Sequence, residues 1–146
     1  MDNASEYGHL ETVIYLNSIG KTCTTNAMDY ASEAGYIDIV QYLHWIGKDC
    51  TTDAMDYASE AGHLKIVQYL HSIGKKCTEY AMDGASENGH FPIVEFLLSI
   101  GQTCGEEAVE HIRKRVVSMQ NLRCESMNIQ ELLNTYKQTL VICDEQ

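Results

Sequence analysis

Four cysteines recur at a fixed interval of 27 residues, and a thiol can form a disulfide, bind zinc or act as a nucleophile. They are Cys23, Cys50, Cys77 and Cys104. None belongs to the short C-x₂-C pair typical of zinc sites. Equivalent residues of packed helical units lie about 10 Å apart, whereas a disulfide needs Cα atoms within about 7 Å. We therefore expect small buried thiols and no metal. Cys124 and Cys143 stand outside the series, and we expect them to be free thiols as well.

Histidine recurs in the same register, in a Gly-His pair at His9, His63 and His90, with Tyr36 in the second copy. We expect structural imidazoles that form hydrogen bonds to backbone groups between units. No motif places a Ser, Cys or carboxylate beside a base, and there is no Gly-rich phosphate loop. The sequence thus predicts neither an enzyme nor a cofactor.

Carboxylates form the third series, in which each Asp is followed four residues later by a Glu. On a helix this spacing places both side chains on one face. Stacked units would align them in two parallel rows, an acidic stripe suited to a basic peptide or protein. Asp near a helix start also stabilises the helix by about 0.3–1 kcal/mol without any partner. A binding stripe and a solvated face therefore both remain open.

The elements that position these residues are repeated units of 27 residues. Residues 31–57 and 58–84 are identical at nineteen of 27 positions. Each unit reads as two helices: the first follows a capping Thr51 or Thr52, Gly62 breaks the chain, and the second ends at Gly74. Such units bury their apolar faces only by stacking. A leucine-rich repeat of similar period would need an L-x-x-L-x-L strand segment, which is absent.

The stretch "ASEAGHLKIVQYLHSIGKKC" resembles the ankyrin core A-A-x-x-G-H-L-x-I-V-x-x-L-L-x-x-G-A-D-V, and the match recurs four times. Two features depart from the family. Its T-P-L-H opening is replaced by segments such as Asp53-Ala54-Met55-Asp56, and the period is about six residues below the usual 33. The missing residues fall where the family has a β-hairpin finger. The resemblance implies an all-α, ankyrin-like helix-turn-helix solenoid without fingers, similar to arrays of amoebae and giant viruses.

The domain organisation follows from the repeats. Residues 1–104 form four units, the first of which begins part-way, so its helix frays or the chain is one piece of a longer array. Residues 105–146 form a C-terminal helical cap, with helices over 105–120 and 128–142 and a capping box at Asn128 and Glu131. In the basic run "HIRKR" we expect a solvated face, with Glu110 and Lys114 paired.

The resemblance also implies a function, because ankyrin repeats commonly contact partners through residues just before the Gly-His turn, on the concave side. We therefore expect a non-enzymatic scaffold or adaptor that binds a basic protein. The alternative is a structural subunit of a larger assembly, including a viral one. The candidate partner-binding residues are Glu6, Tyr7, Asp29, Glu33, Asp56, Glu60, Asp83, Glu87 and Asn88.

Charge and hydropathy exclude other classes of partner. The net charge of −11 disfavours binding to nucleic acids and anionic membranes. No apolar run approaches the roughly 20 residues of a membrane span, and the first residues do not resemble a signal peptide. We expect an intracellular, cytoplasmic protein, or a virion component if it is viral, that is a monomer or part of a larger assembly.

Overall fold

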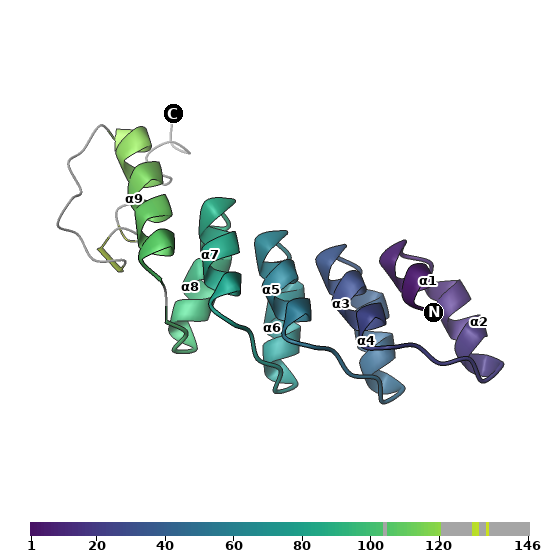
Figure 1. Ribbon diagram of the computed structural model, residues 1–146. Coiled ribbons are helices and arrows are strands. Elements are labelled where there is room, and N and C mark those ends of the chain that lie inside the picture. The colour runs from purple at the N-terminus through teal and green to yellow at the C-terminus, as the bar shows by residue number, and fades with distance from the viewer. Residues whose placement is uncertain (104, 121–129, 132–133, 135–146) are drawn as a thin grey trace.

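The computed structural model describes residues 1–103, 105–120, 130–131 and 134. Within these residues the protein contains nine helices and no strand, arranged as a row of stacked helix pairs (Figure 1). This confirms the predicted all-α solenoid. The predicted helix over 128–142 falls mainly on residues outside the described part of the chain.

The helices form two layers, which run side by side along the stack (Figure 1). The first layer holds α1 (Asp2–Glu6), α3 (Asn26–Glu33), α5 (Asp53–Glu60), α7 (Tyr80–Glu87) and α9 (Glu106–Gln120). The second layer holds α2 (Leu10–Ser18), α4 (Ile37–Trp45), α6 (Leu64–Ser72) and α8 (Phe91–Ser99). In the first layer each helix packs on the next, and α9 continues this layer against α7. We call the outer surface of the first layer the first-helix face.

Within a unit, the third pair shows how the sequence makes two helices. Helix α5 ends before Gly62, which adopts a φ of 87° that suits only glycine well. Besides Met55, the apolar side chains that α5 buries are the small Ala54 and Ala58, and the buried Ser59 hydroxyl donates a hydrogen bond to the carbonyl of Met55 at 2.7 Å. In α6, Val67 and Leu70 are fully buried. The core is therefore continuous along the stack.

The histidines after the glycines pack between units. A Cβ placed on Gly35 would lie 2.6 Å from Cε1 of His63, and one on Gly62 would lie 2.6 Å from Cε1 of His90. Tyr36 covers Gly8 in the same way. Each ring thus rests on the bare backbone of the preceding unit. His63 and His90 thus pack between units by steric fit, whereas the hydrogen bonds to backbone groups stay a prediction and His9 of the first unit is exposed.

The second layer has its own contacts between units. The Asn17 side-chain amide donates to the Tyr42 hydroxyl at 3.1 Å, and one unit later His44 Nδ1 and the Tyr69 hydroxyl are hydrogen-bonded at 2.8 Å. Equivalent residues of the two contacts are 27 residues apart, which is the repeat period, so both layers fix the register of the stack.

Candidate functional site

The aspartates of the predicted acidic stripe lie inside the junctions between units. The backbone N–H and the hydroxyl of Thr51 donate to the carboxylate of Asp29, at 2.9 and 3.1 Å. Thr78 donates to Asp56 in the same way, at 2.8 Å for both bonds. Asp29 is 4% and Asp56 is 5% exposed. These two carboxylates therefore bind the next unit of their own chain, and Asp56 also lines a hollow described below.

The threonine in each of these junctions also serves its own helix. The Thr51 hydroxyl accepts a hydrogen bond from the backbone N–H of Asp53 at 3.1 Å while it donates to Asp29. One side chain thus caps α5 and ties it to α3. Burial raises the pKa of Asp29 and of Asp56, and the hydrogen bonds from the threonines oppose this effect.

The junction between α7 and α9 lacks this bond. Asp83 is the fourth aspartate of the row, but Gly105 stands where the earlier units have threonine. Oδ1 of Asp83 is buried and has no hydrogen-bond partner within the part of the chain that the structure describes. Burial raises the pKa of Asp83, and the neighbouring carboxylates of Glu107 and Glu79 raise it further. The last aspartate therefore carries an unsatisfied acceptor.

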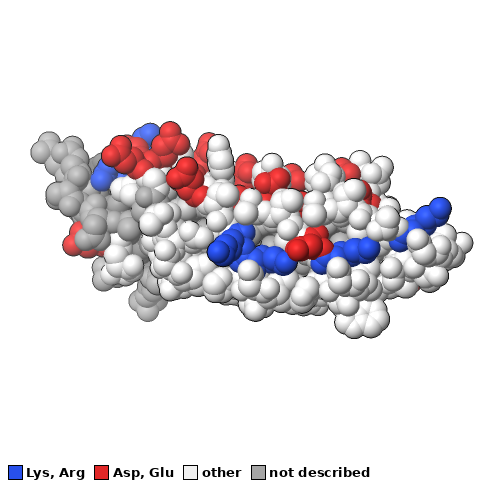
Figure 2. All heavy atoms as spheres, turned by 60° about the horizontal axis from the view of Figure 1, so that its bottom comes forward, with Lys and Arg blue, Asp and Glu red and all other residues white. Residues whose placement is uncertain are grey.

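The glutamates of the stripe, in contrast, face solvent. Glu33, Glu60 and Glu87 are exposed, and Glu6 is half-buried. A hollow of about 610 Å³ lies between α3 and α5, and both Glu33 and Glu60 line it. Figure 2 shows Asp and Glu gathered along one long edge of the molecule, apart from a band of Lys.

The lysines near the links between units are partly used within the stack. Lys48 Nζ donates to the Thr22 hydroxyl at 3.0 Å, and Lys75 forms an ion pair with Asp49. Each of these lysines thus reaches back to the preceding unit. On the face shown in Figure 2, the Lys and Arg side chains of this band, with an acidic group between them, lie apart from the row of Asp and Glu along the edge.

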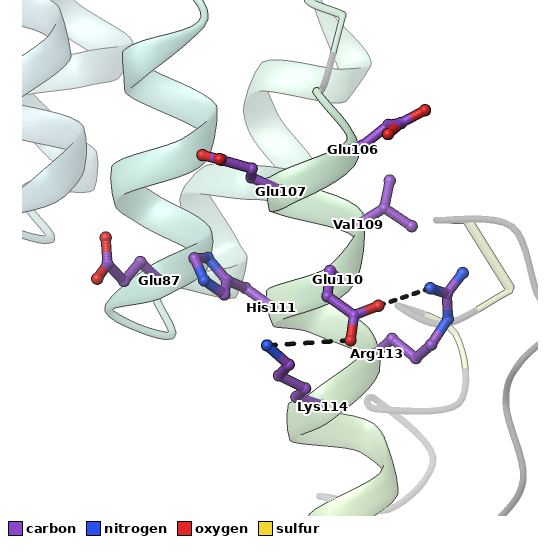
Figure 3. A pocket seen from close by; sticks show the side chains of 8 residues that line it. All are labelled: Glu87, Glu106, Glu107, Val109, Glu110, His111, Arg113 and Lys114. Carbon is purple, nitrogen blue, oxygen red and sulfur yellow. Dashed lines mark hydrogen bonds and ion pairs between the residues drawn. The ribbon is translucent and has the colours of Figure 1, made fainter.

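A second hollow, of about 840 Å³, lies between α7 and α9. Figure 3 shows Glu107 and His111 projecting from α9 toward α7, whereas Glu106 projects away. Glu110 binds Arg113 at 2.8 Å and Lys114 at 3.9 Å, which confirms the predicted Glu110–Lys114 pair. One carboxylate of the same helix thus pairs with two cationic side chains of the basic run.

The other candidate residues of the stripe stand on the same face. Tyr7 is 63% exposed, and Asn88 is exposed while its amide donates to the carbonyl of Gly84 at 3.0 Å. Sequence reasoning missed Tyr57, Tyr80 and Glu107, which line a third hollow together with Glu60 and Glu87. The sequence contained a signal for this hollow in the series Tyr30, Tyr57, Gly84. The replacement of tyrosine by glycine at the third position indicates that the surface of this unit differs from that of the earlier units.

The cysteines lack the environment of reactive thiols. Cys23, Cys50 and Cys77 are free and half-buried. Burial raises the pKa of Cys50 to about 11, so its thiol stays protonated at neutral pH. Among the described residues, no three His, Cys, Asp or Glu side chains are arranged to hold a metal ion. Cys104, Cys124 and Cys143 lie outside the described residues.

Each unit is a helix pair that turns at a left-handed glycine, and an aromatic or imidazole ring packs on the equivalent glycine of the preceding unit. These features define a helical repeat array of the ankyrin type. A family model described as "Ankyrin repeats (3 copies)" matches residues 28–108, more than half of the chain. The chain therefore belongs to the ankyrin repeat family. This family consists generally of protein–protein interaction modules and is usually non-catalytic.

Among solved structures, the chain is similar to the human ASB11 ankyrin repeat domain, with 18% sequence identity and a TM-score of 0.64. The match covers 79% of this chain and 63% of that one, and it shows the shared fold. A search of curated proteins gave no match. The comparisons do not support the viral origin considered above. None of the described helices is both long and apolar enough to cross a membrane.

Proposed function

We propose that the protein is a non-enzymatic scaffold or adaptor that binds a basic protein partner on its first-helix face. One observation carries the proposal: the aspartate row is used within the stack, while the parallel glutamate row at Glu33, Glu60 and Glu87 stays exposed beside hollows. Stacking does not require these glutamates, since no partner within the described part of the chain engages them. A row of carboxylates at a fixed spacing attracts and orients a positively charged surface.

The proposal extends to the division of the chain. Residues 1–104 would form the recognition module, and residues 105–146 would cap it. The packing of α9 on α7 supports this division, because an array needs a terminal element that covers its last unit.

Affinity capture from a lysate of the source cells tests the proposal. Wild-type protein is compared with the combined variant Glu33→Lys, Glu60→Lys and Glu87→Lys. The matched control is Glu11→Lys, Asp38→Lys and Glu79→Lys, which changes the net charge equally at exposed positions outside the hollows. We expect a basic protein that is captured by the wild type and the control and lost with the first variant. Equal capture by all three would contradict the proposal.

A subunit of a larger assembly is the second candidate function, because the second layer exposes large aromatic side chains. Trp45 is 79% and Tyr15 is 62% exposed. Sedimentation velocity over a range of protein concentrations decides between the two. An adaptor stays monomeric at every concentration, and a self-assembling subunit forms oligomers as the concentration rises. Trp45→Ser, which restores the residue found in the other units, should abolish any self-association through this surface.

A further inference from the structure

The third hollow of the first-helix face differs from its neighbours in shape. It measures about 360 Å³ and lies between α5, α7 and the start of α9. Tyr57 and Tyr80 contribute aromatic surface, Gly84 contributes bare backbone, and Glu60, Glu87 and Glu107 contribute carboxylates. Tyr57 is 40% and Tyr80 is 73% exposed, so both aromatic rings are accessible from solvent.

The tyrosine series stops at this hollow. Tyr30 and Tyr57 occupy equivalent positions on α3 and α5, and the next member of the series is Gly84 on α7. A Cβ placed on Gly84 would lie 2.9 Å from Cβ of Glu60, so α5 and α7 approach too closely for a side chain at this position. The hollow is therefore walled by bare backbone at Gly84 and by the side chain of Tyr57.

The electrostatics of the hollow favour a cation. Asp53 foremost, and then Glu33, Glu60 and Asp56, raise the pKa of the Tyr57 hydroxyl, which reports the negative potential around this ring. Asp83 also lines the hollow, and its Oδ1 lacks the threonine that satisfies Asp56 one unit earlier. This position thus combines aromatic walls with exposed carboxylates.

We propose that this hollow, the arginine pocket, takes an arginine side chain from a basic segment of the partner protein. The inference rests on the proposed function and specifies which side chain of the partner protein binds at this position of the first-helix face. A guanidinium stacks on aromatic rings and binds carboxylates through two parallel N–H groups. A lysine ammonium has one charged centre and gains less from a planar wall, so the pocket selects arginine over lysine.

Chemical-shift titration of the ¹⁵N-labelled full chain tests this assignment. The probes are three capped peptides of equal length, in which a central pair of residues is arginine, lysine or citrulline, the neutral analogue of arginine. We expect the arginine peptide to bind in the millimolar range, with the largest shifts at Tyr57, Gly84 and Glu107. The lysine peptide should bind about fivefold more weakly, and the citrulline peptide should not bind.

Two tyrosine variants locate the site. Tyr57→Leu removes the aromatic wall and should weaken the arginine peptide about fivefold. Tyr30→Leu makes the same change one unit earlier, outside the arginine pocket, and should change the affinity by less than about twofold. The spectrum of each variant away from the mutated helix confirms that the stack is intact.

Several outcomes would overturn the arginine pocket. They are equal affinity for the arginine and lysine peptides, equal effects of the two leucine variants, or no shift at all. Shifts spread evenly over Glu33, Glu60 and Glu87 would remove the pocket but keep the proposed function. Failure of the proposed function shows instead in the charge-reversal capture, which needs no arginine pocket.

Discussion

The junction between α5 and α7 and the junction between α7 and α9 start from the same sequence pattern and end differently. In the first, the carboxylate of Asp56 is satisfied by Thr78, and His90 rests on Gly62. In the second, Asp83 faces Gly105, and the nearest atom to a Cβ on Gly89 is 3.9 Å away within its own unit. The interior junction is closed by two specific contacts that the terminal junction lacks.

This difference shows that the two carboxylate rows of the repeat have different roles. The aspartate row holds the stack together wherever the following unit supplies a threonine, and the glutamate row four residues later remains available for a partner. The arginine pocket lies mainly on the outer surface between α5 and α7, and it reaches Glu107 at the start of α9. Recognition is therefore expected at the last complete junction of the stack, beside the junction that lacks the threonine.

The largest effect is expected from glycine substitutions. Gly62→Ala forces an alanine to a φ of 87° and drives its Cβ to 2.6 Å from the His90 ring, so we expect a loss of about 3 kcal/mol in the free energy of unfolding. Gly89→Ala has a similar φ of 76° but no such contact, and should lose about 1–2 kcal/mol. Urea unfolding measures both. Equal losses would show that the ring on Gly62 exerts no steric constraint.

Aspartate substitutions come next. Asp56→Ala removes the acceptor of two hydrogen bonds and should lower the free energy of unfolding by about 2 kcal/mol. Asp83→Ala removes a carboxylate whose Oδ1 has no partner, and should change the free energy by less than about 0.5 kcal/mol or increase it. If Asp83→Ala proved as damaging as Asp56→Ala, the contrast between the two junctions would be wrong.

A single change can restore the missing bond. Gly105→Thr places a hydroxyl beside Asp83, and a Cβ at this position would lie 3.6 Å from Oδ1, an ordinary contact. We expect thermal or urea unfolding to show a gain of about 1 kcal/mol. Gly105→Val has the same shape without the hydroxyl and serves as the control. A gain of the same size with valine would mean that chain stiffness, and not the hydrogen bond, stabilises the junction.

The smallest effect is a pH dependence. Burial raises the pKa of Asp56 in the folded chain above its ordinary value of 3.8, so the folded state binds more protons between these two values. As the pH falls from 7 through this window, the wild type should gain free energy of unfolding relative to Asp56→Asn, which does not titrate. Urea unfolding at several pH values measures this difference. A change of the opposite sign would show that the Thr78 bonds outweigh burial and lower the pKa.

Much of the fold could be predicted from the sequence because every structural cue occurs several times. Gly62 marks the turn, and Val67 and Leu70 mark the buried face, in a pattern that recurs at a fixed period. Thr51 or Thr52 was predicted to cap the helix; Thr52 is the N-cap residue and forms no side-chain cap bond, whereas the Thr51 hydroxyl accepts from the N–H of Asp53. Periodic apolar positions and glycines specify helix pairs locally, without knowledge of neighbouring units.

The candidate site was harder to predict because it depends on contacts between units. An Asp and a Glu four residues apart share a helix face, and only the packing of the next unit shows that Asp29 is covered by Thr51 while Glu33 is not. The role of Gly84 likewise depends on its distance from Glu60 on another helix. Spacing within one helix cannot distinguish a residue that joins two units from one that faces solvent.

The central claim is that the two carboxylate rows have different roles, and one pair of variants tests it most directly. Asp29→Ala, which lies outside the arginine pocket, and Glu60→Ala, which lines it, are compared for their free energy of unfolding and their affinity for the arginine peptide. We predict that Asp29→Ala loses about 2 kcal/mol of stability, because it removes the acceptor of the two Thr51 hydrogen bonds, with affinity within about twofold of wild type. Glu60→Ala should keep its stability within about 0.5 kcal/mol and bind about fivefold more weakly. Loss of binding with Asp29→Ala at unchanged stability, together with unchanged binding by Glu60→Ala, would contradict the account.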